Sequence, residues 1–205
     1  MQKSKLLVVL STGFAACALA GGALAEGLEL PKKLEGKAVV LKPDDPDYVR
    51  AKVDSAVKPA GMGGVSQALV VRVTQDIPVY RMWNGPNKKD ARGNTNRLGG
   101  WWSYDAPHGP ASKYRSDYEI CVAWNDLTWM ATCTLKAGAV VAIGPGQSVS
   151  AETCGDPTGK ETYAANDKDW QTYVDKPWTR AAELVCPPDS ADYPAASNNI
   201  AKGNQ

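Results

Sequence analysis

The sequence predicts an α+β fold with a β-rich body, and three observations support this prediction. Short runs of β-branched and apolar residues recur from residue 68 onward, as they do in the strands of a sheet. Apolar residues at helical spacing are clearest over 46–58. Four cysteines follow residue 25, and an even number in an exported chain indicates disulfide bonds that staple the fold.

Residues 1–25 have the features of a signal peptide. Two lysines precede an apolar stretch, and Ala23-Leu24-Ala25 supplies small residues at a cleavage position. The apolar stretch is interrupted and too short for a transmembrane anchor. Cys17 leaves a lipoprotein signal as an alternative. We therefore expect a secreted or periplasmic protein that is cleaved near Ala25 and has no stable membrane insertion.

The charge of the exported chain is nearly balanced. The full sequence has 23 basic and 22 acidic residues, and removing residues 1–25 takes away two lysines and no acid, which leaves 21 and 22. This balance gives no reason to expect nucleic acid or an anionic membrane as the partner.

The rest of the chain divides into an N-terminal extension with one helix (26–65), a β-rich domain (66–186) and a flexible tail (187–205). In the extension we expect a strand near 38–41 and a helix over 46–58, with proline in its first turn.

Six strands are expected in the β-rich domain, at 68–73, 77–83, 118–124, 128–135, 139–143 and 169–174. A turn at 124–127 would join two of them in a hairpin. Residues 84–115 are rich in glycine, proline and polar residues, and loops of this length are usually functional or mobile. Residues 178–185 could form two helical turns.

The four remaining cysteines are Cys121, Cys133, Cys154 and Cys186. Zinc is the alternative to disulfides, but the chain has no C-x-x-C pair and a single histidine, His108. Of the three possible connectivities we expect Cys121–Cys133 and Cys154–Cys186. The first pair flanks the expected hairpin, and the second would fix the carboxyl-terminal segment to the body.

The candidate binding residues are Tyr80, Arg81, Trp101, Trp102 and Ser103, which stand in two short aromatic segments. A guanidinium can hold two phosphate oxygens at once, and an indole can stack on a flat ring. The alternatives are an exposed strand arginine and tryptophans that belong to the core. Together these residues indicate a site for a flat ligand that carries negative charge.

Other patterns are weaker. A serine hydrolase would need a base for Ser103, but no G-x-S-x-G motif is present and His108 lies in a loop rich in proline and glycine. Residues 143–148 form a glycine-rich turn without the lysine of a phosphate-binding P-loop. Gln147 in this turn, or Gln171 on the last expected strand, could bind a ribose hydroxyl.

In their order along the chain, these segments resemble the ADP-ribosyltransferase-like toxin domains, especially the TNT-type NAD glycohydrolases of bacterial polymorphic toxins and fungal spores. The resemblance spans roughly residues 68–175. It is carried by Tyr80-Arg81-Met82-Trp83-Asn84-Gly85, Gly99-Gly100-Trp101-Trp102-Ser103, Pro107, Tyr114-Arg115, Asn125, Leu135-Lys136-Ala137-Gly138, Gly144-Pro145-Gly146-Gln147 and Gln171.

The resemblance implies a β-rich split sheet with few short helices that binds NAD in a cleft as a substrate, without a bound cofactor. Arg81 would match the first-strand arginine that holds the dinucleotide, and Ser103 with the preceding tryptophan would match the second-strand motif. Gln171, or else Gln147, would take the place of the third-strand catalytic residue. The chain lacks the Glu-x-Glu or Gln-x-Glu pair common in transferases, which favours water as the acceptor.

The leading hypothesis is therefore an exported NAD glycohydrolase that acts as a toxin on other cells and has an immunity protein as its partner. The alternative is a non-enzymatic, tryptophan-rich module that binds glycan or cell wall. A third hypothesis is a structural or inhibitory exported protein whose tryptophans are all in the core.

Overall fold

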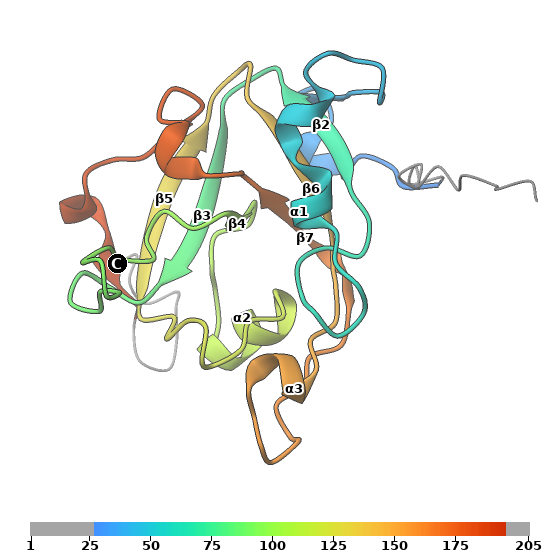
Figure 1. Ribbon diagram of the computed structural model, residues 1–205. Helices are drawn as coiled ribbons and strands as arrows, with labels where there is room; N and C mark the ends of the chain where they lie inside the picture. The colour runs from blue at the N-terminus through green and yellow to red at the C-terminus, as the bar shows by residue number, and fades with distance from the viewer. Residues whose placement is uncertain (1–26, 196–205) are drawn as a thin grey trace, which may run out of the picture.

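The computed structural model describes residues 27–195; the expected signal peptide and residues 196–205 lie outside this range. The chain folds around a sheet with a few short helices (Figure 1). The strands are β1 Ala38–Val40, β2 Leu69–Val73, β3 Ile77–Trp83, β4 Trp101–Ser103, β5 Trp129–Leu135, β6 Val140–Gly146, β7 Asn166–Tyr173, β8 Leu184–Val185 and β9 Tyr193–Pro194. The helices are α1 Val53–Ala56, α2 Ala111–Asp117 and α3 Ala151–Cys154, with 3-10 turns η1 Lys32–Leu34, η2 Tyr48–Ala51, η3 Pro177–Thr179 and η4 Asp189–Ala191.

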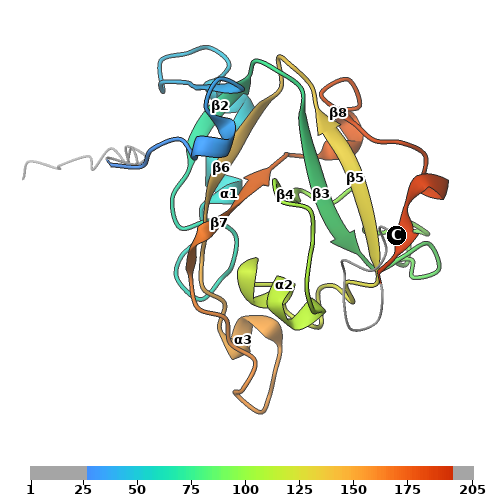
Figure 2. The same cartoon turned by 180° about the vertical axis from the view of Figure 1, so that it is seen from behind.

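Eight strands follow the order β1-β2-β6-β7-β4-β3-β5-β8, and β9 pairs with the other end of β5. The pairings between these strands are antiparallel. The outermost strands β1 and β8 are not paired with each other within the described chain, so the sheet is open. Figures 1 and 2 show that the β2, β6 and β7 group diverges from β3 and β5 toward the end where α2 and α3 lie.

Strands β2 and β6 are buried on both faces, which explains their nearly continuous apolar sequences. On one face Val71 and Val141 contact a large core that also contains Trp102. On the other, Val70 and Val140 pack against a second cluster that includes residues of η2 and α1. The extension therefore covers one face of the sheet and adds β1 to its edge.

Most of the expected strands are confirmed: β1, β2, β3, β5, β6 and β7 lie within or close to the predicted ranges. The helix expected over 46–58 is broken into η2 and α1, because Lys52 between them adopts a left-handed conformation with φ of 52°. The strand expected at 118–124 is wrong, since this segment forms turns after α2. Its apolar residues pack beneath α2 or enter a disulfide instead of pairing in the sheet.

Two elements lie inside the stretch expected to be a long loop. Strand β4 is only three residues long and pairs with both β3 and β7. Helix α2 packs through Tyr114 against Met82 and Met130, so very few of its residues give an amphipathic pattern in the sequence.

The helix expected over 178–185 is also wrong, because this segment forms η3 and then β8, which pairs with β5.

All four cysteines form disulfides, as expected, but the expected pairing is wrong. The bonds are Cys121–Cys154 and Cys133–Cys186. The hairpin that suggested Cys121–Cys133 does not exist, because β5 pairs with β3 along its whole length. Cys133 therefore faces the large core beside the carboxyl-terminal segment, while Cys121 lies outside the sheet near α3.

The carboxyl-terminal segment is tied to the body up to the last described residues. Asp192 and Arg97 form a buried ion pair, and Arg97 also donates a hydrogen bond to the carbonyl of Pro187 at 2.7 Å. Among residues 27–195, no helix has the length and apolar character needed to cross a membrane.

Candidate functional site

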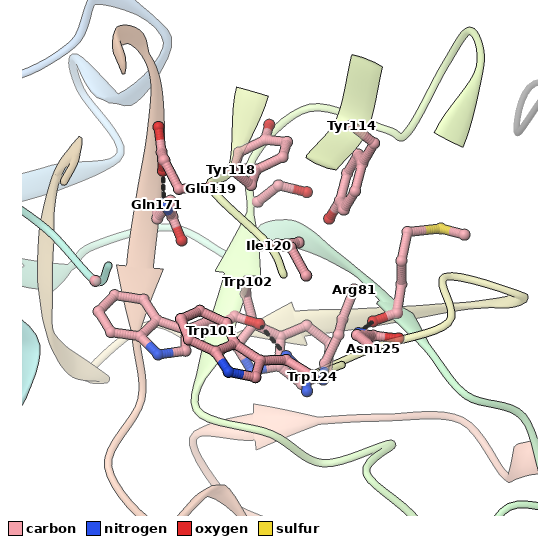
Figure 3. Close-up of a pocket in the computed structure, with 13 residues that line it drawn as sticks. Arg81, Trp101, Trp102, Tyr114, Tyr118, Glu119, Ile120, Trp124, Asn125 and Gln171 are labelled. Atoms are coloured by element: carbon pink, nitrogen blue, oxygen red, sulfur yellow. Dashed lines mark hydrogen bonds between the residues drawn. The ribbon is translucent and has the colours of Figure 1, made fainter. Parts of the chain in front are cut away.

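A pocket of about 150 Å³ lies where β3, β4 and β7 face α2 and the segment that follows it (Figure 3). Its walls are mainly aromatic, with a few polar groups placed among the rings. The lining residues are Gly64, Arg81, Met82, Trp101, Trp102, Ser103, Tyr114, Tyr118, Glu119, Ile120, Trp124, Asn125 and Gln171. Three side chains expected to carry function, Arg81, Ser103 and Gln171, therefore line one pocket.

The sheet order explains why these three residues meet. Tyr80 on β3 pairs with Ser103 on β4, and Ser103 pairs in turn with Gln171 on β7. Arg81 follows Tyr80, at the point where β3 and the short β4 separate. Residues 90 positions apart in the chain are thus brought onto three adjacent strands.

Arg81 is held at the pocket by the backbone. Its Nε donates to the carbonyl of Asn96 at 3.1 Å and its Nη1 to the carbonyl of Trp101 at 2.9 Å. No carboxylate in residues 27–195 forms a salt bridge with it. Burial lowers the pKa of Arg81 to about 10, so the guanidinium is still charged at neutral pH. The pocket therefore contains a cation without an anionic partner among the described residues.

Gly99 makes the position of Arg81 possible. A Cβ built on this glycine would overlap the guanidinium, so any other residue would push Arg81 away from the backbone. Glycine is therefore required at position 99 for a steric reason: the Arg81 side chain lies directly against the backbone there.

Ser103 is buried at the back of the pocket. Its hydroxyl lies 3.2 Å from the carbonyl of Tyr80 and 3.0 Å from that of Asp105. The rings of Tyr114 and Tyr118 stand over this region with their centroids 4.6 Å apart. Burial raises the pKa of both tyrosines, so their hydroxyls stay neutral hydrogen-bond donors. Ser103 therefore lines the pocket with its hydroxyl engaged by two backbone carbonyls.

The two adjacent tryptophans have different environments. Trp102 belongs to the large core, and its Nε1 donates to the carbonyl of Gly99 at 2.8 Å. Trp101 is half-buried, contacts Tyr173 with ring centroids 4.9 Å apart, and lines the pocket. The third indole of the pocket is Trp124, which is 42% exposed. Trp101 and Trp124 therefore have indole surface available to a ligand, whereas Trp102 supports them from the core.

Gln171 has a partner that sequence reasoning missed. Its Nε2 donates to Oε2 of Glu119 at 3.0 Å, as the dashed line in Figure 3 marks. Glu119 is only 1% exposed, and its other oxygen, Oε1, makes no hydrogen bond within the described chain. Burial, together with the nearby carboxylates Asp169 and Asp117, raises the pKa of Glu119 to about 9. At neutral pH this group is a neutral carboxylic acid.

The other expected binding residues lie elsewhere. Tyr80 is on β3 but does not line the pocket. Gln147 also lies outside it, since its Nε2 donates to the carbonyl of Lys58 and its Oε1 accepts from the N–H of Ser148. Of the two candidate glutamines, Gln171 is therefore the one in the pocket.

A sequence signal for Glu119 existed. It is the single charged residue in the run Tyr118-Glu119-Ile120-Cys121-Val122, where an isolated acid suggests a buried carboxyl. The pattern over 118–124 instead led to the prediction of a strand, and Glu119 was not singled out. The segment after α2 also brings Ile120 and Trp124 to the pocket, which required knowing that it leaves the sheet.

One possible metal-binding group exists in residues 27–195, formed by Cys121, Cys154 and Glu161. Because the two sulfurs are joined in a disulfide, they do not serve as thiolate ligands.

In the comparisons with known proteins, no family model, curated protein or solved structure matches this chain. The function must therefore be inferred from the geometry of the pocket.

Proposed function

We propose that the protein is an exported NAD glycohydrolase of the ADP-ribosyltransferase-like type, which cleaves the bond between nicotinamide and ribose and acts on other cells. The observation that carries the proposal is the Arg81 guanidinium, which stands without a carboxylate partner in the described chain inside an aromatic pocket that also contains Gln171. A half-buried cation of this kind favours an anionic ligand, because an anion restores the electrostatic stabilisation that the guanidinium loses on leaving water.

The pyrophosphate of NAD has the chemistry that such a guanidinium binds. A planar fork with several N–H donors matches two phosphate oxygens, and the neighbouring indole of Trp101 offers a face on which a ring can stack. The expected fold type is supported by the placement of Arg81, Ser103 and Gln171 on three adjacent strands of an open antiparallel sheet.

The size of the pocket favours partial burial of the dinucleotide. Pockets that enclose a whole drug-sized ligand usually measure roughly 300–1,000 Å³, whereas this pocket is about 150 Å³. It is suited to the nicotinamide ring with the adjoining ribose, while the adenosine half would lie over the rim near Trp124.

The reaction makes modest demands on the protein. The C1′–N bond breaks with both electrons going to nicotinamide, which leaves as a neutral molecule, and positive charge develops on the ribose. Water then adds to C1′ and loses a proton to solvent. Gln171 would stabilise the charged ribose through its carboxamide oxygen, while Arg81 would hold the pyrophosphate.

The direct test is release of nicotinamide from NAD by the purified, oxidised protein, measured by chromatography. Arg81→Ala is expected to lower kcat/KM by at least about a hundredfold, because it removes charge-assisted hydrogen bonds worth about 1.5–3 kcal/mol each. Arg81→Lys keeps the charge but loses the fork, so we expect an intermediate value.

Arg72→Ala is the matched control, since Arg72 is also a strand arginine but forms ion pairs with Asp45 and Asp47. Circular dichroism of each variant separates loss of activity from loss of the fold. The proposal is rejected if the wild-type protein releases no nicotinamide, or if folded Arg81→Ala is as active as Arg72→Ala.

A glycan-binding module is the second candidate, favoured by the exposed indole of Trp124 beside Trp101 at the pocket. Exposed aromatic faces can stack on sugar rings. Retention on insoluble polysaccharide that disappears in the Trp101→Ala, Trp124→Ala double variant would favour this function. The hypothesis that all tryptophans are in the core is wrong, since Trp178 is 66% exposed.

A further inference from the structure

The side chain of Glu119 occupies a space that the fold keeps open for it. Glu119 follows α2 in a left-handed conformation with φ of 48°, which turns its side chain toward β6 and β7. A Cβ built on Gly146 of β6 would overlap both carboxyl oxygens of Glu119. A carboxyl group therefore lies directly against the backbone of a buried strand, where another residue in place of Gly146 would exclude it.

The two oxygens of this carboxyl have different surroundings. Oε2 accepts a hydrogen bond from Nε2 of Gln171 at 3.0 Å, whereas the buried Oε1 has no hydrogen-bond partner in residues 27–195. A buried polar atom without a partner is costly, so its presence calls for an explanation. Glu119 is one of the residues that line the pocket with Arg81 and Ser103.

The charged groups around Glu119 favour its protonated form. Asp117 at the end of α2 and Asp169 on β7 are the carboxylates that act on it, and no lysine or arginine of the described chain forms an ion pair with it. The Asn166 backbone and the Gln171 carboxamide oppose this effect, but burial and the two aspartates dominate and raise the pKa to about 9. Because Oε2 accepts the hydrogen bond from Gln171, the proton belongs on the buried Oε1.

We propose that Glu119 is a positioning residue of this site: its Oε2 holds Nε2 of Gln171, so that the carboxamide oxygen of Gln171 is presented to the ligand. This inference rests on the proposed NAD-cleaving function and adds to it an explanation of how a glutamine keeps one orientation. An amide side chain can present either its oxygen or its nitrogen, and a fixed acceptor on one side decides which of them faces the ligand.

If the site works only while Glu119 is neutral, activity has an upper pH limit. Ionisation would place a third negative charge beside Asp117 and Asp169 in a buried space. The cost of this charge outweighs the stronger hydrogen bond that Gln171 gives to a carboxylate, so the side chain would turn toward water and release Gln171. Activity should therefore fall as the pH rises through about 9. If Glu119 acted as a general base, activity would instead rise over the same range.

The test is a profile of kcat and KM against pH from 6 to 10, corrected for the alkaline decay of NAD itself. Glu119→Ala is expected to lower kcat at neutral pH by about tenfold or more, with a smaller change in KM. Glu119→Gln, which still offers an acceptor to Gln171, should restore kcat to within about threefold of wild type and remove the alkaline fall. Glu152→Gln, an exposed position on α3, is the control for loss of one carboxylate.

A second readout is independent of activity. In ¹⁵N spectra, the side-chain amide of Gln171, assigned by its loss in Gln171→Ala, should shift with pH near 9 in the wild type and not in Glu119→Gln. If the amide shifts but no nicotinamide is released, the proposed function fails and the positioning role stands. If the amide does not shift, or if Glu119→Gln is as inactive as Glu119→Ala, the positioning role is overturned.

Discussion

Replacing Glu119 by glutamine is expected to stabilise the folded protein at pH 8. The pKa of Glu119 is raised from an ordinary value of 4.5 to about 9, mainly by burial. Between these two values the unfolded chain releases the proton while the folded protein keeps it. The free energy of unfolding therefore falls as the pH rises from about 4.5, and the loss is complete only above about 9.

The size of this loss in the free energy of unfolding follows from the difference between the two pKa values of Glu119. Each pH unit costs about 1.4 kcal/mol, so the whole interval from 4.5 to about 9 corresponds to on the order of 6 kcal/mol. A carboxylate that turns toward water on ionising avoids part of this cost. We expect the wild-type free energy of unfolding to decrease by about 3 kcal/mol between pH 5 and pH 9 because of this group, and Glu119→Gln to remove that decrease.

The assay is denaturation by urea from pH 5 to 9, followed by tryptophan fluorescence with both disulfides intact. Glu119→Gln should match the wild type near pH 5 and exceed it by about 2 kcal/mol at pH 8 and about 3 kcal/mol at pH 9. Glu152→Gln, with the same change at an exposed position, serves as the control. A Glu119→Gln variant that is less stable than wild type at pH 8, or that keeps the wild-type slope, would refute the reasoning.

Three further predictions concern stability. Gly146→Ala should cost at least about 2 kcal/mol, because its methyl group would displace the Glu119 carboxyl, and thermal unfolding measures this. Trp102→Ala should cost about 4 kcal/mol, while exposed Trp178→Ala should change the free energy of unfolding by less than about 0.5 kcal/mol; equal effects would contradict the burial of Trp102. Replacing both Cys121 and Cys154 by alanine should cost about 3–4 kcal/mol for a loop of 33 residues, and an unchanged denaturation midpoint would be the contrary result.

The long strands were predictable because their signal is local. The sequences of β2, β3, β5 and β6 are rich in apolar and β-branched residues, and each strand is largely buried in the core. Short elements were not predictable in this way. Strand β4 contributes three residues and is defined by its neighbours β3 and β7, while α2 has a single buried residue, Tyr114.

The sequence predicted several residues of the pocket but not the contacts among them. The arginine beside an aromatic strand segment, the glycine-tryptophan segment and a late glutamine led to Arg81, Ser103 and Gln171, which do line one pocket. Glu119 escaped notice because the alternation around it resembles a strand. The segment that contains Glu119 in fact follows α2 outside the sheet, where the Cys121–Cys154 disulfide fixes it.

The sequence by itself determined where the long strands lie, that the cysteines form disulfides, and which polar residues deserve attention, since these properties follow from local pattern and composition. Only the tertiary structure decided which cysteines pair, which indoles remain accessible, and that a buried acid holds the glutamine of the pocket. Those features depend on residues that are distant in the chain, such as Glu119, Gly146 and Gln171, and the distance between them is set by the order of strands in the sheet.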